Sequence, residues 1–196
     1  MKRILSFLLL LCLAGAQAQE SFPETKPFKY YKNDLKVTVL SLFSGSTKLT
    51  YERAITRTQR MEITGGVIGW GGDWLNHNHS KGGLCRLAYK FNFNYKYPHS
   101  KPEHFLNGFY LKPELAFSSF SYEAREGGER LHNNRLAIMG CIGYQWVCHR
   151  FVFDIFGGLG AGIGDENEYN YYHGFIALPK GTPTAFTAGF KLGVAF

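Results

Sequence analysis

The sequence predicts an all-β protein, an eight-stranded antiparallel up-and-down transmembrane β-barrel. Three observations lead to this prediction. From about residue 34 onward, apolar residues alternate with polar or small ones, which is the period of side chains along a strand. Turn-forming residues separate the alternating segments. Aromatic residues make up 16% of the chain and glycines number 23, and both favour tightly packed strands over helices.

The alternation and the turn residues place the eight strands. Clusters such as Ser44-Gly45-Ser46, Gly71-Gly72-Asp73 and Gly127-Gly128 are typical of turns and divide one strand from the next. We expect strands at 34–43, 47–56, 60–70, 83–95, 108–120, 134–147, 150–164 and 185–196.

The N-terminus has the three parts of a secretory signal. Lys2 and Arg3 precede an apolar run from Ile4 to Ala14, and Ala16-Gln17-Ala18 supplies small residues for cleavage before Gln19. The apolar run is too short for a membrane-spanning helix, which needs about 20 residues. We therefore expect a signal peptide at 1–18, a periplasmic N-terminal segment at 19–33 and the barrel at 34–196.

The expected mature chain is a single domain of modest positive charge. Without its first 18 residues it has 178 residues and a net charge of +5, and no dense run of lysine or arginine points to nucleic acid. Its three cysteines, Cys85, Cys141 and Cys148, cannot all pair internally. Cys141 and Cys148 could meet across one hairpin. Their spacing fits no common metal-ligand pattern.

The two faces of each segment differ in chemistry. In the last strand Phe186, Ala188, Phe190, Leu192, Val194 and Phe196 share one face, and Ala185, Thr187, Gly189, Lys191, Gly193 and Ala195 share the other. A soluble barrel turns its apolar face inward, whereas a membrane barrel turns it toward lipid and lines its lumen with the polar face. Segment lengths near the 9–11 residues of a tilted membrane strand and aromatic segment ends favour the membrane barrel.

An eight-stranded lumen is only wide enough for side chains to fill it, so we expect a packed polar interior. Buried charges must be paired and hydrogen-bonded. Because basic residues are in excess, some are expected to point to the wet ends. We expect Gly158, Gly160 and Gly162 to leave room for long charged side chains. The predicted interior residues are Lys36, Lys48, Glu52, Arg60, Glu62, Arg86, Lys90, Lys112, Glu114, Asp154 and Lys191, in a structural rather than a catalytic role.

Several motifs carry a family resemblance. They are Ser41 to Ser46 leading into Leu49-Thr50-Tyr51-Glu52-Arg53, Tyr110 to Glu114, Gly143-Tyr144-Gln145-Trp146 and Gly157 to Gly162. With these motifs the chain resembles the small OmpA/OmpX-like outer-membrane barrels, and more closely the uncharacterised families of similar size assigned to that class. The resemblance covers most of the mature chain and implies a location in the cell outer membrane of a Gram-negative bacterium. It says little about activity.

The C-terminal sequence is the most specific match. The run from Phe190 to Phe196 resembles the signal read by the barrel assembly machinery, with a terminal Phe and apolar residues at every second position. The resemblance implies that both termini are periplasmic. Connections after odd strands, 44–46, 71–82, about 121–133 and 165–184, then lie outside the cell. The long connection near 96–107 departs from this pattern.

Chemistry-bearing motifs are weak. Some outer-membrane lipases and lipid A deacylases resemble a barrel with a His-x-Ser pair on one strand face, the His acting as base. In His77-Asn78-His79-Ser80 neither spacing puts a His and the Ser on one face, and two histidines are a weak metal-ligand set. The loop from Asp165 lacks the pattern of a calcium loop. Asp73, His77, Asp165 and His173 could converge at the rim, but no spacing requires it. We therefore predict no catalytic, cofactor-binding or metal-binding residues and no cofactor.

The favoured hypothesis is an integral outer-membrane barrel with a structural or surface-interaction role and no open pore. Its partners would be outer-membrane lipids, the assembly machinery through Phe196 and an unidentified surface ligand met by the loops 71–82 and 165–184. One alternative is a barrel enzyme that hydrolyses lipid A or phospholipid with His77, His79, Ser80 or Asp165. The other is a soluble, lipocalin-like periplasmic carrier with its apolar faces inward.

Overall fold

A computed structural model of the chain describes residues 31–56, 58–73, 79–93, 106–123, 128–165, 170–178 and 183–196. Residues 1–30, which include the predicted signal peptide, lie outside this description. The strands are β1 (Asn33–Thr38), β2 (Ser44–Ala54), β3 (Gln59–Asp73), β4 (Lys81–Asn92), β5 (Gly108–Glu123), β6 (Arg130–Cys148), β7 (Phe151–Gly164), β8 (Ile176–Ala177) and β9 (Thr184–Ala195), with one short helix, α2 (Val39–Phe43). No helix among the described residues has the length and apolar character needed to cross a membrane.

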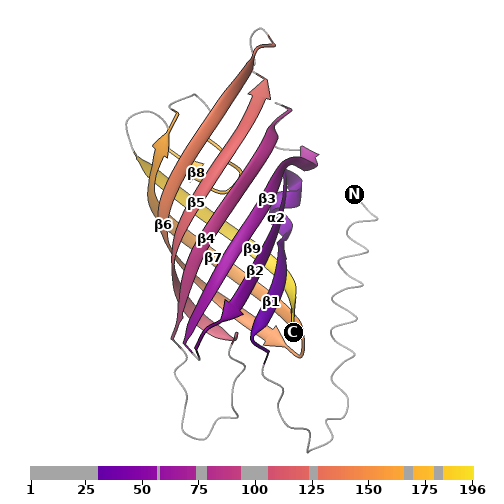
Figure 1. Ribbon diagram of the computed structural model, residues 1–196, viewed down its shortest axis with the longest axis vertical. Coiled ribbons are helices and arrows are strands. Elements are labelled where there is room, and N and C mark those ends of the chain that lie inside the picture. The colour runs from indigo at the N-terminus through magenta and orange to yellow at the C-terminus, as the bar shows by residue number, and fades with distance from the viewer. Residues whose placement is uncertain are drawn as a thin grey trace, which may run out of the picture.

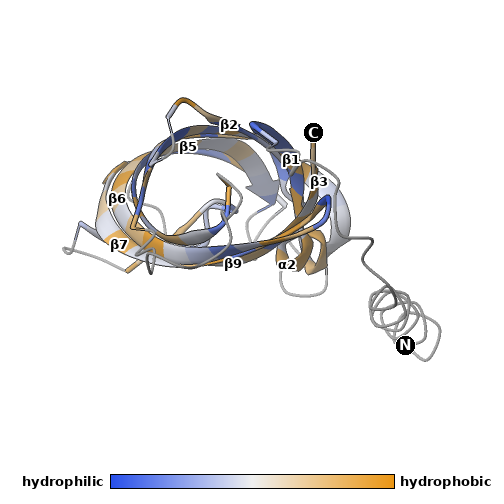
Figure 2. Ribbon diagram, turned by 90° about the horizontal axis from the view of Figure 1, so that it is seen from below, coloured by the Kyte–Doolittle hydropathy of each residue, from blue (hydrophilic) through white to orange (hydrophobic). Residues whose placement is uncertain are grey.

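The strands form a closed antiparallel barrel (Figures 1 and 2). Each strand from β1 to β6 pairs with the next in sequence, β7 pairs with β9, and β9 pairs with β1 to close the ring. The two-residue β8 is a side branch on β9. The predicted all-β fold with an eight-stranded, up-and-down antiparallel barrel is confirmed.

The first strand is shorter than predicted, because it ends at Thr38 and a turn of helix follows. The Ser41 hydroxyl donates to the Thr38 carbonyl at 2.7 Å, and the Ser44 hydroxyl donates to the Ser41 carbonyl at 3.1 Å. Such local hydroxyl bonds offer the backbone an alternative to sheet pairing. Alternation alone could not detect this, because Val39 to Phe43 continues the apolar content of the strand.

The shortened β1 leaves part of the barrel wall to other elements. β1 pairs with β9 only from Lys191 to Ala195, whereas β8 pairs with β9 at Ala185 and Phe186. Helix α2 packs against β2, β3 and β9 at this seam. The Tyr171 hydroxyl donates to the Ser44 hydroxyl at 2.6 Å and ties the segment before β8 to the start of β2.

Strands β5 and β6 are longer than predicted and project beyond the other strands at one end of the barrel (Figure 1). The register of β6 with β7 ends at Arg135, whereas its register with β5 continues to Arg130. Because β5 pairs with β4 as far as Ser121, only the outermost residues of the β5–β6 hairpin pair with each other alone. An ion pair between Arg130 and Glu123 at 3.8 Å lies at its tip and is half exposed.

Side chains alternate between the lumen and the outer surface as predicted, and the apolar faces point outward. In β4, Leu87 and Phe91 are exposed, whereas Arg86 and Lys90 between them are buried. Each of the eight barrel strands carries large exposed apolar side chains on its outer face. One example from each strand, in chain order, is Leu35, Leu49, Ile63, Leu87, Leu115, Ile138, Ile155 and Val194. A lipocalin-like arrangement requires the opposite orientation, and the structure is inverted relative to it.

Candidate functional site

The lumen is filled by charged and polar side chains from all eight barrel strands. Each strand contributes inward-facing positions because its polar residues recur every second position. The buried charged residues are Asp34, Lys36, Lys48, Glu52, Arg60, Glu62, Arg86, Lys90, Lys112, Glu114, Asp154 and Lys191. All eleven interior residues predicted from the sequence are in this set, and Asp34 was missed because it lies at the predicted strand boundary.

Two lysines occupy the centre of the network and bridge three carboxylates. Lys36 Nζ lies 2.5 Å from Glu52 Oε2 and 3.1 Å from Asp154 Oδ2. Lys90 Nζ lies 2.6 Å, 2.9 Å and 2.9 Å from carboxylate oxygens of Glu52, Glu62 and Asp154. The three carboxylates come within 4.8 Å of one another, and the two ammonium groups supply the positive charge that such a cluster requires.

Neutral polar side chains add hydrogen bonds to this cluster. The amide oxygen of Gln145 accepts hydrogen bonds from Lys36 and Lys90 at 3.1 Å and 3.2 Å, and its amide nitrogen donates to Asp34 at 2.9 Å. The Tyr110 hydroxyl donates to Asp154 Oδ1. The sequence did not single out Tyr110 or Gln145, although their phase within β5 and β6 places them on the lumen face.

A second group of charges surrounds an aromatic ring. Arg86 and Lys112 pair with Glu114, and Lys191 pairs with Glu62 at 2.8 Å. The cationic groups of Arg86, Lys112 and Lys191 all lie over the ring of Phe156, at 5.3 Å, 4.3 Å and 4.9 Å from its centroid. The face of Phe156 thus stabilises three neighbouring cations in the interior by cation–π contact.

Apolar residues close the lumen at both ends. At the end that carries the β5–β6 hairpin, Tyr172, Phe175 and Ala177 pack onto a buried cluster that includes Phe120 and Met139. The other end is closed by a smaller cluster, Ala54, Leu106, Val152 and Ala195. The segment 171–177 is therefore a plug inside the mouth. This segment belongs to the predicted outer connection 165–184, and the structure buries its residues Tyr172, Phe175 and Ala177 instead of extending them outward.

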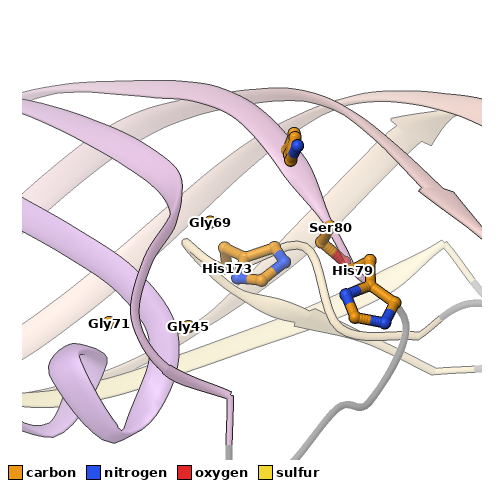
Figure 3. A pocket seen from close by; sticks show the side chains of 7 residues that line it. Gly45, Gly69, Gly71, His79, Ser80 and His173 are labelled. Atoms are coloured by element: carbon orange, nitrogen blue, oxygen red, sulfur yellow. The ribbon is translucent and has the colours of Figure 1, made fainter.

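A small cavity of about 150 Å³ lies beside this plug, among the ends of β2, β3 and β4 (Figure 3). His79, Ser80, Lys81 and His173 line it together with Gly45, Gly69 and Gly71. The ring of His173 stands edge-on to Phe120, with centroids 5.0 Å apart, and 4.8 Å from the Tyr171 ring.

His173 is held in its neutral form. Burial, reinforced by the positive charge of Lys48, lowers its pKa from 6.5 to about 3, and the backbone of Ser44 acts weakly in the opposite direction. Burial also raises the pKa of the Tyr171 hydroxyl.

The residues considered for catalysis are only partly brought together. His79 and Ser80 lie before the start of β4, and His79 has a positive φ of 45°. The alternation of side chains along a strand therefore does not apply to this pair, and both residues line one cavity. Asp165 is elsewhere, since its carboxylate accepts from the backbone N–H of Asn134 at 2.9 Å. His77 and the side chain of Asp73 lie outside the described residues.

Two further expectations need correction. The expectation that some basic side chains point into water at the ends of the barrel is wrong, since all the predicted interior lysines and arginines are buried. Of Gly158, Gly160 and Gly162, which were expected to leave room for charged side chains, only Gly162 borders one, Arg135. A Cβ at Gly158 or Gly160 would collide with Cys141 or with the β6 backbone instead, so these glycines allow close packing of β6.

The cysteines do not form the hairpin bridge that the spacing left open. Cys141 and Cys148 lie on the same strand, β6, with Cys141 buried and Cys148 exposed. They and Cys85 are free thiols among the described residues.

Comparisons with known proteins add little beyond the fold. No protein-family model matches the chain, and no curated protein matches it in sequence. Among solved structures, the crystal structure of the N-terminal β-barrel domain of Pseudomonas aeruginosa OprF is similar, with 12% sequence identity and a TM-score of 0.49. The alignment covers 85% of this chain and 98% of that chain. At this identity and TM-score we draw nothing about function from the likeness.

Proposed function

We propose that the protein is an integral outer-membrane β-barrel protein of a Gram-negative bacterium, with a structural or surface-interaction role and a lumen closed by side chains. The observation that carries the proposal is the inverted distribution of polarity. Lys36, Lys90 and Asp154 are fully buried, whereas Ile138 on the outer surface is 65% exposed. Water disfavours such an apolar surface, and lipid favours it.

Aromatic side chains support the same proposal. The end of the barrel with the short β6–β7 turn carries a band of exposed or half-exposed rings on adjacent strands, formed by Phe93, Phe109, Tyr144, Trp146, Phe151 and Phe153. Trp70, which is 70% exposed, lies near the other end of β3. Aromatic girdles at both interfaces are typical of outer-membrane barrels.

The network supports a closed lumen. Lys90 on β4 reaches Asp154 on β7, and Lys36 on β1 reaches Gln145 on β6, so ion pairs and hydrogen bonds cross the bore. The apolar plug at the mouth adds a second barrier. A surface role is supported by the β5–β6 hairpin, which projects furthest from the barrel (Figure 1).

The proposal is tested by fractionation of a Gram-negative host that expresses the full chain. We expect the protein in the outer membrane, with a faster gel mobility before heating than after it. Recovery as a soluble periplasmic protein would overturn the proposal and favour a carrier. In planar bilayers we expect no conductance steps from the purified protein, and a stable channel would contradict the closed lumen.

We also propose that Phe196 is read by the barrel assembly machinery. Its backbone pairs with Asn33 at 2.9 Å, which closes the barrel, while its ring is 58% exposed on the outer surface. Deletion of Phe196 should reduce the outer-membrane level of the protein several-fold. Phe93→Ala is the matched control, because that ring is equally exposed and belongs to the aromatic band. Equal levels of the two variants would contradict this assignment.

A further inference from the structure

The mouth cavity contains a buried histidine whose ring nitrogens make no hydrogen bond of standard geometry within the part of the chain that the structure describes, although the backbone of Ser44 lies close enough to act on the ring weakly. His173 is only 2% exposed, and neither Nδ1 nor Nε2 has a hydrogen-bond partner of standard geometry among the described residues. Figure 3 shows its ring at the cavity that Ser80 and His79 also line. A buried polar group without a partner costs about 1–3 kcal/mol, so such a group at a cavity would gain from a ligand that supplies a hydrogen-bond partner.

The backbone that forms the cavity wall is tightly packed and adopts unusual conformations. Gly69 and Gly71 have φ values of +96° and +148°, and a Cβ at either would lie 2.7 Å from a backbone carbonyl oxygen. His79 and His173 also adopt positive φ values, 45° and 59°, which are uncommon for residues other than glycine. Sparsely populated backbone conformations of this kind cluster at ligand-binding sites.

The electrostatic environment of the cavity is positive. The lumen beneath it holds seven buried basic and five buried acidic side chains, so the interior carries an excess of positive charge. Lys48, which acts electrostatically on His173, has no ion pair within 4.0 Å among the residues that the structure describes, unlike Lys36 or Lys90. At the rim, Lys81 lines the cavity directly.

We propose that this cavity binds a small oxyanion of the phosphate class, to which His173 and Ser80 donate hydrogen bonds and Lys81 contributes charge. A volume of about 150 Å³ corresponds to roughly five water molecules, which suits one oxyanion with a bridging water. A metal cation is disfavoured, because Lys48 and Lys81 would repel it and the cavity offers two histidines as its only strong ligands among the described residues.

The phosphate can come from a lipid headgroup or from solution. Lys81 lines both the mouth cavity and a groove of about 490 Å³ between β4 and β5. This groove passes over Gly82, Gly83 and Cys85 toward Phe117, and it has the apolar lining that an acyl chain requires. A phospholipid could thus place its phosphate at Lys81 and one chain along the groove.

The test uses the full barrel folded in dodecyl maltoside, a detergent without phosphate. Inorganic phosphate is titrated calorimetrically in one arm, and micelle-dissolved phosphatidic acid is titrated in the other, with diacylglycerol as the phosphate-free lipid control. His173→Phe keeps the aromatic packing on Phe120 and removes both ring nitrogens, and Lys81→Gln removes the rim charge. Arg53→Gln is the matched control, since it removes an exposed positive charge at the opposite end of β2.

We expect His173→Phe to weaken binding roughly tenfold or more and Lys81→Gln to weaken it about two- to fivefold, whereas Arg53→Gln leaves it unchanged. Binding in both arms supports free phosphate as a ligand, and binding of phosphatidic acid alone supports the lipid headgroup. No binding in either arm, or the same affinity in Lys81→Gln and the unaltered protein, overturns the proposal. If His173→Phe does not fold, the Lys81→Gln result decides. Because the titration is made in detergent, its failure is distinct from failure of the fractionation test.

Discussion

Lys90 Nζ lies 2.9 Å from Asp154 Oδ2 and joins β4 to β7 through the interior of the barrel. Neither residue is accessible to solvent, and Lys36 meets the same carboxylate oxygen from β1 at 3.1 Å. Removal of one partner from such a group leaves an uncompensated buried charge, which is far more costly than loss of an exposed pair. The network is therefore both the filling of the lumen and a constraint on which strands face each other.

Asp154→Asn should destabilise the folded barrel by about 3–5 kcal/mol, because Lys36 and Lys90 both lose a charged partner. Urea titration of the protein in lipid vesicles, followed by the folded band on unheated gels, measures this change. Glu123→Gln is the control, since it breaks the half-exposed pair with Arg130 and should cost about 1 kcal/mol or less. Similar costs for the two variants would show that the interior network is not a major source of stability.

Gly189→Ala should destabilise the barrel by about 1–3 kcal/mol through overpacking. A Cβ at this position would lie 2.6 Å from the ring of Phe156, which is itself held beneath three cationic groups. Gly140→Ala is the matched control on the outer surface, where the nearest neighbour of the added carbon would be 4.0 Å away. The same urea titration compares the two, and a neutral Gly189→Ala would mean that Phe156 can move away from its cations.

Ile138→Lys tests whether the outer surface faces lipid. Ile138 lies in the middle of β6 opposite Leu115, and a lysine at the midplane of a bilayer costs about 2–4 kcal/mol. Ile55→Lys, in the turn between β2 and β3, should cost about 1 kcal/mol or less because it lies near the interface. In a water-soluble barrel both changes would be tolerated alike, so equal unfolding free energies in vesicles would contradict membrane insertion.

The sequence predicted the barrel because alternation is a local signal repeated over many residues. Arg86, Lys90 and Asp154 could be assigned to the lumen from their phase alone, and closure then brought them together. The pairing itself could not be predicted, because it depends on the stagger of strands that are far apart in sequence. Alternation also says nothing about where a strand gives way to helix, as at Val39.

The mouth of the barrel was predicted least well. His173, Tyr172 and Phe175 lie in a segment without periodicity, and a polar outer loop was the natural interpretation of its composition. Their burial arises from tertiary packing on Phe120, which lies about fifty residues earlier in the chain. The gathering of His79, Ser80 and His173 likewise depends on positive φ values that residue type does not reveal.

His173 should make the stability of the barrel depend on pH. Its pKa of about 3 in the folded state lies below the ordinary value of 6.5, so the unfolded chain binds the proton more readily. The stability contributed by neutral His173 is complete above pH 6.5 and is lost as the pH falls toward 3. By pH 5 the loss should reach about 2 kcal/mol. Urea titrations at pH 7.5 and pH 5 in phosphate-free buffer, on the unaltered protein and on His173→Gln, isolate this contribution because other groups titrate in both. The variant should lose less stability on acidification, and an identical loss in the two proteins would mean that the plug admits water to the ring.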